Sequence, residues 1–143
     1  MANQSLKALA QDYHKRLERF CDLEIVELKD SDEKAGAQRL AREAERIKTT
    51  AESFSDCMLL DEKGKSLSSI ELSKTIVALE NGSVKKWTLI IGSSHGIHED
   101  IKKAIPRKLQ LSQMTLTHEW ARALLLEQIY RAYTIKLNLP YHH

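Results

Sequence analysis

The sequence predicts an α/β protein with a largely parallel sheet, because segments with strand and helix periodicity alternate along the chain. Short apolar runs such as Leu89-Ile90-Ile91 end in turns rich in glycine and serine, which is typical of buried strands. The longer segments between them repeat apolar residues at three- and four-residue steps, which is typical of amphipathic helices. A length of 143 residues favours a single domain over residues 1–143.

The first half of the chain predicts two helices and two strands. Apolar residues from Leu6 to Leu17 predict a helix over residues 3–20. Residues 23–28 (LEIVEL) alternate apolar and acidic side chains, which predicts a strand with one solvated face. A charged helix is expected over residues 32–54, where small residues such as Ala41 and Ala44 indicate close packing. Residues 57–61 predict a short buried strand, and residues 62–65 predict the turn that follows it.

The second half continues the alternation. Ser68 and Glu71 form a capping box that opens a helix ending near Asn81-Gly82. A strand over residues 87–91, a short helix over 98–105 and a last strand over 109–112 are expected next. Thr117 is the expected cap of a closing helix over residues 118–137. The resulting order, α-β-α-β-α-β-α-β-α, is typical of a parallel sheet covered by helices.

Composition excludes several classes of protein. Hydrophobic residues make up 42% of the chain and charged residues 29%, as in ordinary globular domains. No apolar run approaches the roughly 20 residues of a membrane span, and the first residues lack a signal peptide's apolar core, so we expect a cytoplasmic protein. The net charge of +2 permits an RNA partner without arguing for one. Cys21 and Cys57 are expected to be buried reduced thiols.

The stretch LIIGSSHGI (residues 89–97) is the first candidate for a ligand site. Its apolar strand ends at Gly92, and loops at the carboxyl ends of parallel strands are where open α/β sheets bind ligands. Glycine there lets a ligand approach the backbone closely. The stretch matches neither a dinucleotide-binding nor a Walker motif, so by itself it names no ligand.

Three other features leave their interpretation open. The closing helix has a broad apolar face, which predicts either a helix covering the sheet or a subunit interface; Glu127 and Arg131 form an i,i+4 pair on another face. His95 and His98 straddle a turn and a helix start, no zinc spacing is present, and we expect no metal site. The tail NLPYHH ends in groups that stack on bases or exchange protons, or else forms a frayed terminus.

Six segments, in this order, resemble the RlmH family of SPOUT methyltransferases, which methylate N3 of a pseudouridine in 23S ribosomal RNA. They are DYHKRLERFCDLEIVELKD (12–30), EAERI (43–47), LLDEKGKSLSS (59–69), LIIGSSHGI (89–97), LSQMTLTHEWARALLLEQIYRAY (111–133) and PYH (140–142). The resemblance covers nearly the whole chain and is densest over residues 111–142.

The resemblance implies a SPOUT-type α/β fold with a deep trefoil knot in its C-terminal, cofactor-binding part, about residues 88–143. It also implies a homodimer, with each pocket near the subunit interface, and S-adenosylmethionine bound in a bent shape among three loops. By matching position, the cofactor-binding residues would be Leu60, Gly92, Gly96, Leu111, Ser112, Gln113, Met114, Thr115 and Leu116.

Three residues match family positions suited to catalysis: His118, Tyr141 and His142. The acceptor N3–H must lose its proton, so a base or a group that stabilises the uracil anion is needed, and the resemblance does not assign the base among the three. The family acts on the assembled ribosome, which makes the ribosome and a second copy the expected partners and excludes membrane and DNA. Lys102, Lys103, Arg107 and Lys108 predict either an RNA-binding patch or an ordinary solvated face.

The chain departs from the family pattern at three places. The family's usual first strand, of the type K-I-x-I-x-x-V-G-K, is absent before the helix that opens at MANQSLKALA. Ser93 stands where a second glycine is usual, and His143 stands where a lysine or arginine usually follows Tyr-His. These departures keep two alternatives open: a weakly active or non-catalytic knotted dimer, and a SPOUT methyltransferase with another RNA target.

Overall fold

The computed structural model describes residues 3–28, 36–51, 56–92 and 96–143. Five helices and three strands lie within these ranges: α1 (Gln4–Leu17), α2 (Gly36–Ala51), β1 (Cys57–Ser66), α3 (Ser69–Asn81), β2 (Thr88–Ile90), α4 (Glu99–Ala104), β3 (Lys108–Gln110) and α5 (His118–Lys136). The helices match the expected positions to within a few residues, and the α/β class is confirmed.

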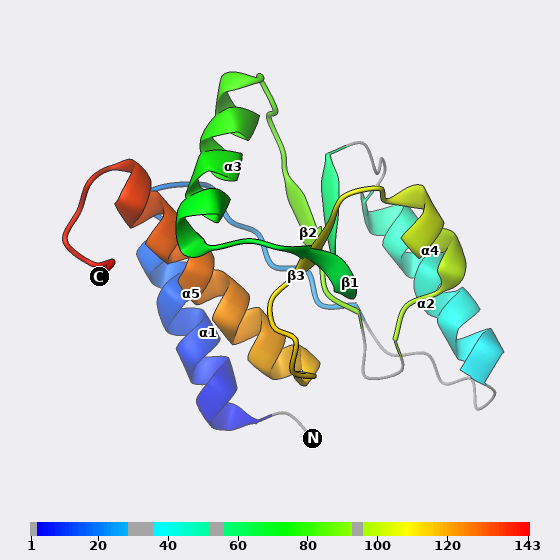
Figure 1. Cartoon of the computed structure of the whole chain (residues 1–143). Coiled ribbons are helices and arrows are strands. Elements are labelled where there is room, and N and C mark those ends of the chain that lie inside the picture. The colour runs from blue at the N-terminus through cyan, green and yellow to red at the C-terminus, as the bar shows by residue number, and fades with distance from the viewer. Residues whose placement is uncertain (1–2, 29–35, 52–55, 93–95) are drawn as a thin grey trace.

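The three described strands form a parallel sheet in the order β2-β1-β3 (Figure 1). The central strand, β1, places Leu59 opposite Ile90 on one side and opposite Lys108 on the other. Strands that follow one another through helices run parallel because a crossover returns the chain to the same end of the sheet. The parallel sheet predicted from the alternation of elements is therefore confirmed.

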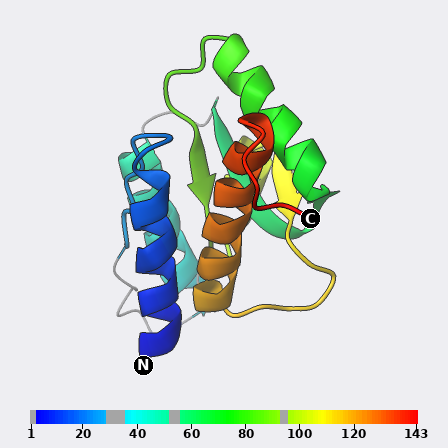
Figure 2. The same cartoon turned by 90° about the vertical axis from the view of Figure 1, so that its left-hand side faces the viewer.

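Helices cover both faces of the sheet (Figures 1 and 2). The helices α1, α5 and α3 lie on one face, where Met58 and Leu109 join the core formed by these helices. The helices α2 and α4 lie on the other face, where Cys57 and Leu59 are buried with Ile101. Successive strand residues point to opposite faces, so β1 supplies both cores, and all three of these residues of β1 are buried.

Local capping sets where the helices begin. The capping box predicted at α3 is present, since the Ser68 hydroxyl accepts from the backbone N–H of Glu71 at 3.1 Å and the Glu71 carboxylate accepts from that of Ser68 at 3.0 Å. Thr117 caps α5 as expected, accepting from the Trp120 N–H. These bonds satisfy backbone donors that the first helical turn leaves unpaired.

The strand expected over residues 23–28 is wrong. In the structure this segment is irregular and pairs with no described strand, and its residues from Glu24 to Leu28 are all exposed. The alternating apolar and acidic side chains therefore do not form one buried and one solvated face here. The segment is held instead through Glu27, which forms an ion pair with Arg122 of α5.

The turn expected over residues 62–65 is also wrong as placed, because it lies inside β1. Leu60 and Lys65 are both paired with Leu109 of β3, so residues 61–64 form a bulge between two paired stretches of the strand. We call residues 61–64 the β1 bulge. Cys57 is buried and Cys21 half-buried, and neither of these two described cysteines forms a disulfide. Within the described residues, no helix is long and apolar enough to cross a membrane.

Candidate functional site

The parallel sheet brings three of the predicted cofactor-binding segments to one edge. Leu60 precedes the β1 bulge and is paired with Leu109, Gly92 follows the end of β2 by two residues, and Leu111 comes directly after β3. Because the carboxyl ends of parallel strands meet at the same edge, residues far apart in sequence become neighbours there. We call Leu60, Gly92, Gly96 and residues 111–116 the carboxyl edge.

The two glycines of the carboxyl edge lie close to each other. A Cβ atom placed on Gly92 would lie 3.3 Å from the carbonyl oxygen of Gly96 and 3.5 Å from the Ile97 side chain. Gly96 has a φ of +87°, a backbone conformation that favours glycine. Ser93 and His95 lie outside the described residues. Gly92 thus presents its backbone, with no side chain, at the carboxyl edge.

The segment between β3 and α5 completes the carboxyl edge. Leu111, Ser112 and Leu116 are half-buried, whereas Gln113, Met114 and Thr115 are exposed, Met114 by 80%. The Ser112 hydroxyl accepts from the Met114 N–H at 2.9 Å. Leu60 and Leu111 offer apolar contact beside this irregular backbone. Apolar side chains beside open backbone groups are a combination that can contact a nucleoside.

The C-terminal tail returns along α5 (Figure 2), and the Tyr141 side chain contacts Tyr13 of α1 and Glu127 of α5. The Tyr141 hydroxyl lies 3.0 Å from that of Tyr13 and donates to Glu127 Oε1 at 3.1 Å. The Tyr130 ring meets the Tyr141 ring edge-on at 4.8 Å between centroids. The guanidinium of Arg131 lies over the Tyr141 ring, 4.8 Å from its centroid. Tyr141 is therefore an ordered part of the helical layer, and the tail is not frayed at this residue.

The Glu127–Arg131 ion pair holds the C-terminal tail against α5. Arg131 donates from Nε and Nη2 to Glu127 Oε1 at 3.0 and 2.6 Å, and its Nη1 lies 3.2 Å from Nδ1 of His142. Sequence periodicity identified the pair but not its contact with the tail. Sequence analysis did not single out Tyr13 and Tyr130. The one signal for their role was that each carries a hydroxyl on an otherwise apolar face.

Burial fixes the protonation state of Tyr141. Desolvation, followed by the hydrogen bond with Tyr13 and the negative charge of Glu127, raises the pKa of the Tyr141 phenol far above its usual value. The hydrogen bond from Arg131 to Glu127 in turn raises the pKa of the guanidinium. Tyr141 is thus a phenol that donates a hydrogen bond at neutral pH.

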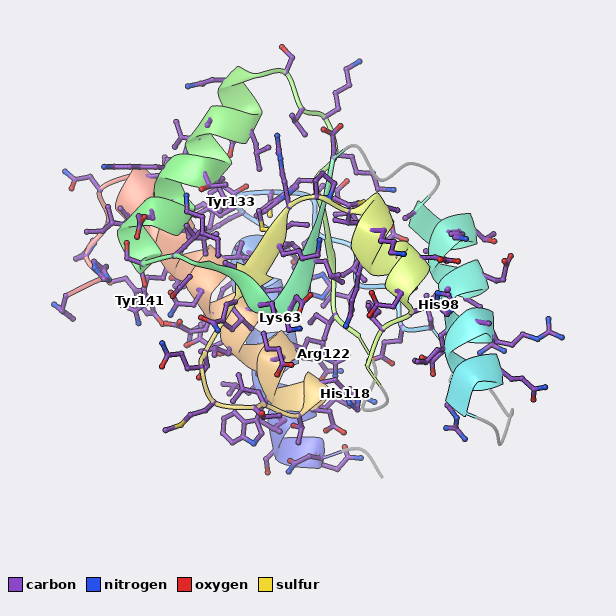
Figure 3. All side chains as sticks on the ribbon, turned by 45° about the vertical axis from the view of Figure 1, so that its right-hand side comes forward. Lys63, His98, His118, Arg122, Tyr133 and Tyr141 are labelled. Atoms are coloured by element: carbon purple, nitrogen blue, oxygen red, sulfur yellow. The ribbon has the colours of Figure 1, made fainter. Side chains whose placement is uncertain are left out.

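The structure separates the third catalytic candidate from the tail within one chain. His118 is the first residue of α5, is exposed, and lies with Nε2 at 4.0 Å from the Glu119 carboxylate. Glu127, which holds Tyr141, comes nine residues later, about 13 Å along the helix axis at about 1.5 Å per residue. Figure 3 shows His118 and Tyr141 well apart along α5. Tyr141 and His142 are brought together, whereas His118 is not.

The apolar face of α5 is largely used inside the chain. Ala121, Leu125, Leu126, Ile129 and Ala132 are buried, and α5 contacts both α1 and α3. On the first turn of α5, Trp120 is the large apolar side chain that stays exposed, with 54% of its surface accessible. The width of the apolar face therefore reflects helix packing, and a subunit interface would have to use the exposed residues.

The predicted basic patch is divided. Lys102 and Lys103 lie on α4, where Lys102 is 3.6 Å from Glu99, whereas Arg107 and Lys108 lie at the start of β3. Sequence analysis missed Lys63 and Lys65, which the β1 bulge places beside Arg107 and Lys108 around a cavity of about 430 Å³. In the described ranges, no three His, Cys, Asp or Glu side chains are grouped to hold a metal ion.

Comparisons with known proteins identify the family of the chain. The family described as "Predicted SPOUT methyltransferase" matches residues 1–142. The chain is 38% identical over 144 residues to a Flavobacterium johnsoniae protein, covering 99% of the chain and 92% of that protein. It is 40% identical over 142 residues to one from Syntrophotalea carbinolica, covering 96% and 90%, and 39% identical over 132 residues to one from Geobacter sulfurreducens, covering 92% and 86%. All three relatives are named ribosomal RNA large subunit methyltransferase H, and this chain belongs to the same family, the RlmH group of SPOUT methyltransferases, which are enzymes.

Proposed function

We propose that the protein transfers a methyl group from S-adenosylmethionine to N3 of a pseudouridine in the 23S RNA of the assembled ribosome. Family membership and the names of the relatives support a methyltransferase that acts on ribosomal RNA. The observation that carries the proposal is the meeting of Leu60, Gly92 and Leu111 at the carboxyl edge. The carboxyl edge of a parallel sheet is where such folds bind ligands, so in a methyltransferase it is the expected place for the methyl donor.

The carboxyl edge would hold the cofactor. Backbone groups at Gly92 and along residues 111–116 would read the edge of the adenine, while Leu60 and Leu111 would contact its faces. The cofactor, when bound, supplies an electrophilic methyl group attached to a positively charged sulfur. Once the methyl group is transferred, the sulfur departs as part of a neutral thioether. Holding such a group in line with its acceptor accounts for much of the acceleration, because positioning alone contributes several kcal/mol.

The tail and His118 would handle the proton. The acceptor N3–H gives up its proton as the new N–C bond forms, so a base with a pKa near neutrality is needed. Tyr141 keeps its own proton, which it donates to Glu127 in the free protein, and it would donate to a carbonyl oxygen of the base by exchanging that bond. His118 and His142 remain the candidates for the proton acceptor. Arg131 orients the tail through its contacts with Tyr141 and His142.

The proposal includes a homodimer, a single domain over residues 1–143 and a trefoil knot over about residues 88–143, in a cytoplasmic protein. Leu9, Val26 and Trp120 are large apolar side chains that are exposed in the single chain, which supports a second copy as partner. Light scattering tests this arrangement directly. A monomer at micromolar concentration would contradict it.

The first experiment is a calorimetric titration with S-adenosylmethionine, followed by transfer of labelled methyl to ribosomes that lack the modification. We expect one site per subunit and saturable transfer. Gly92→Val should abolish cofactor binding in a folded dimer, because the new side chain would press on Gly96 and Ile97. Gly36→Val is the matched control, since nothing lies within 4 Å of a Cβ atom at Gly36.

Each other outcome points to a different function. Cofactor binding without transfer to ribosomes would indicate another RNA target. Absence of cofactor binding by the unmodified chain would favour a non-catalytic member of the family. Equal affinities of the Gly92→Val and Gly36→Val variants would show that the carboxyl edge is not the cofactor site.

A further inference from the structure

The β1 bulge forms one side of a cavity that the proposed reaction does not use. The cavity has a volume of about 430 Å³, within the roughly 300–1,000 Å³ usual for ligand sites. Four cationic residues line it: Lys63 and Lys65 from β1, and Arg107 and Lys108 from the start of β3. Figure 3 labels Lys63 at the bulge. The cations come from two segments more than 40 residues apart in the sequence.

Backbone contacts hold the two segments together. The Leu59 N–H donates to the Arg107 carbonyl at 3.0 Å, and Gln110 Nε2 donates to the Glu62 carbonyl at 2.7 Å. Gly64 approaches β3 so closely that a Cβ atom there would lie 2.7 Å from the carbonyl carbon of Lys108. The cations are therefore brought together by the strand pairing and are not merely near one another on a mobile surface.

The positive charge of the four cations is not neutralised by the other residues that line the cavity. None of the described residues that line it is acidic, and no ion pair joins its four cations to a carboxylate in the described part of the chain. Lys108 donates to the Ile105 carbonyl at 2.8 Å. Glu71 lies within electrostatic range of Lys65, but its carboxylate is bonded to Ser68. Cations held close together repel one another, which an anionic ligand relieves.

We propose that this basic cavity binds backbone phosphates of the ribosomal RNA, beside the carboxyl edge. The inference rests on the proposed function and adds where the RNA strand lies. Lys63 follows Leu60 by three residues, so their Cα atoms are no more than about 11 Å apart. One RNA strand can therefore contact the cavity while its target base reaches the cofactor.

Phosphates fit the cavity better than the carboxylate of the cofactor, which is the other anion at hand. A single carboxylate needs one cation, whereas four cations match successive charges along an RNA strand. Lys63, Lys65 and Arg107 are exposed, so an incoming macromolecule can reach them. Arg107 also carries a guanidinium, whose planar donors match phosphate oxygens in a bidentate manner.

The test compares two double variants that remove the same charge. Lys63→Gln with Arg107→Gln alters the cavity, and Lys15→Gln with Lys48→Gln alters exposed positions on α1 and α2. Binding of purified ribosomes that lack the modification is measured without cofactor, at several salt concentrations. We expect the cavity variant to bind at least tenfold more weakly than the control variant. Its log–log salt slope should be shallower by about 1.4, because each lost contact with single-stranded RNA removes about 0.7.

Calorimetry with S-adenosylmethionine separates the two anions. An unchanged cofactor affinity in the cavity variant supports the phosphate site. Loss of cofactor binding with unchanged ribosome affinity would overturn it and assign the cations to the cofactor. Equal ribosome affinities and salt slopes for the two double variants would also overturn it. Because ribosome binding is measured without methyl transfer, failure of the proposed reaction would leave this comparison valid.

Discussion

Replacing Gly64 by alanine tests the packing of the β1 bulge on β3. The new Cβ atom would lie 2.7 Å from the Lys108 carbonyl carbon and 2.8 Å from the backbone nitrogen and carbonyl carbon of Leu109. Ordinary contacts begin near 3.4 Å, so the two backbones must separate by about 0.7 Å. Gly64 is not among the residues with positive φ, so the clash and not the backbone conformation opposes alanine.

The expected cost follows from two opposing effects. Overpacking a rigid site costs about 1–3 kcal/mol, and alanine recovers about 0.4–1 kcal/mol by restricting the unfolded chain. We expect Gly64→Ala to lower the free energy of unfolding by about 1.3 kcal/mol, the difference between the midpoints of these two ranges. With a slope of about 2 kcal/mol per molar urea, the unfolding midpoint falls by about 0.6 M.

Urea unfolding followed by circular dichroism, at one fixed protein concentration, measures this change. Gly36→Ala is the matched control, because a Cβ atom at Gly36, the first residue of α2, meets nothing within 4 Å. The control should be neutral or slightly stabilising, since alanine favours helix. A Gly64→Ala variant within about 0.5 kcal/mol of the unmodified protein would refute the close approach of the bulge to β3.

Three further changes have defined outcomes. Ser68→Ala removes the acceptor for the Glu71 N–H and should destabilise the protein by about 1 kcal/mol in urea unfolding; no change would contradict the capping box. The hydrogen bond and charge of Arg122 lower the pKa of Glu27. The unmodified protein should therefore have a larger free energy of unfolding than the Glu27→Gln variant above pH 4.5, and this difference should disappear as the pH falls through the lowered pKa. Because Glu27 is exposed, the difference should stay below about 1 kcal/mol, and a difference that persists at pH 2 would contradict this origin. Tyr141→Phe should reduce ribosome methylation at least tenfold with unchanged cofactor affinity, and full activity would show that its hydroxyl is dispensable.

Local signals in the sequence were enough to place the helices. The capping box at Ser68, the cap at Thr117 and Pro106 after α4 each act within a few residues, so α3, α5 and α4 follow from local chemistry. The alternation of helices with apolar runs also predicted the parallel sheet. The candidate carboxyl edge followed from the resemblance together with this sheet, because parallel strands bring their carboxyl ends to the same place.

Contacts between distant segments decide what the sequence could not show. Residues 23–28 alternate as a strand would, but whether a strand forms depends on a neighbour with free backbone groups, and the described strands do not pair with them. The role of Tyr13 depends on Tyr141, 128 residues away. Likewise, Lys63 and Arg107 share a cavity only because β1 pairs with β3 on both sides of the bulge.

The β1 bulge therefore links stability to ribosome binding, and two variants separate shape from charge. Gly64→Ala keeps every cation but displaces Lys63 and Lys65 from Arg107, so it should lower both the free energy of unfolding and the affinity for ribosomes. Lys63→Gln with Arg107→Gln keeps the backbone but removes charge from exposed side chains, so it should lower ribosome affinity with little change in stability. If Gly64→Ala destabilised the protein and left ribosome affinity intact, the cations would act as a diffuse surface charge and the geometry of the cavity would be irrelevant to RNA.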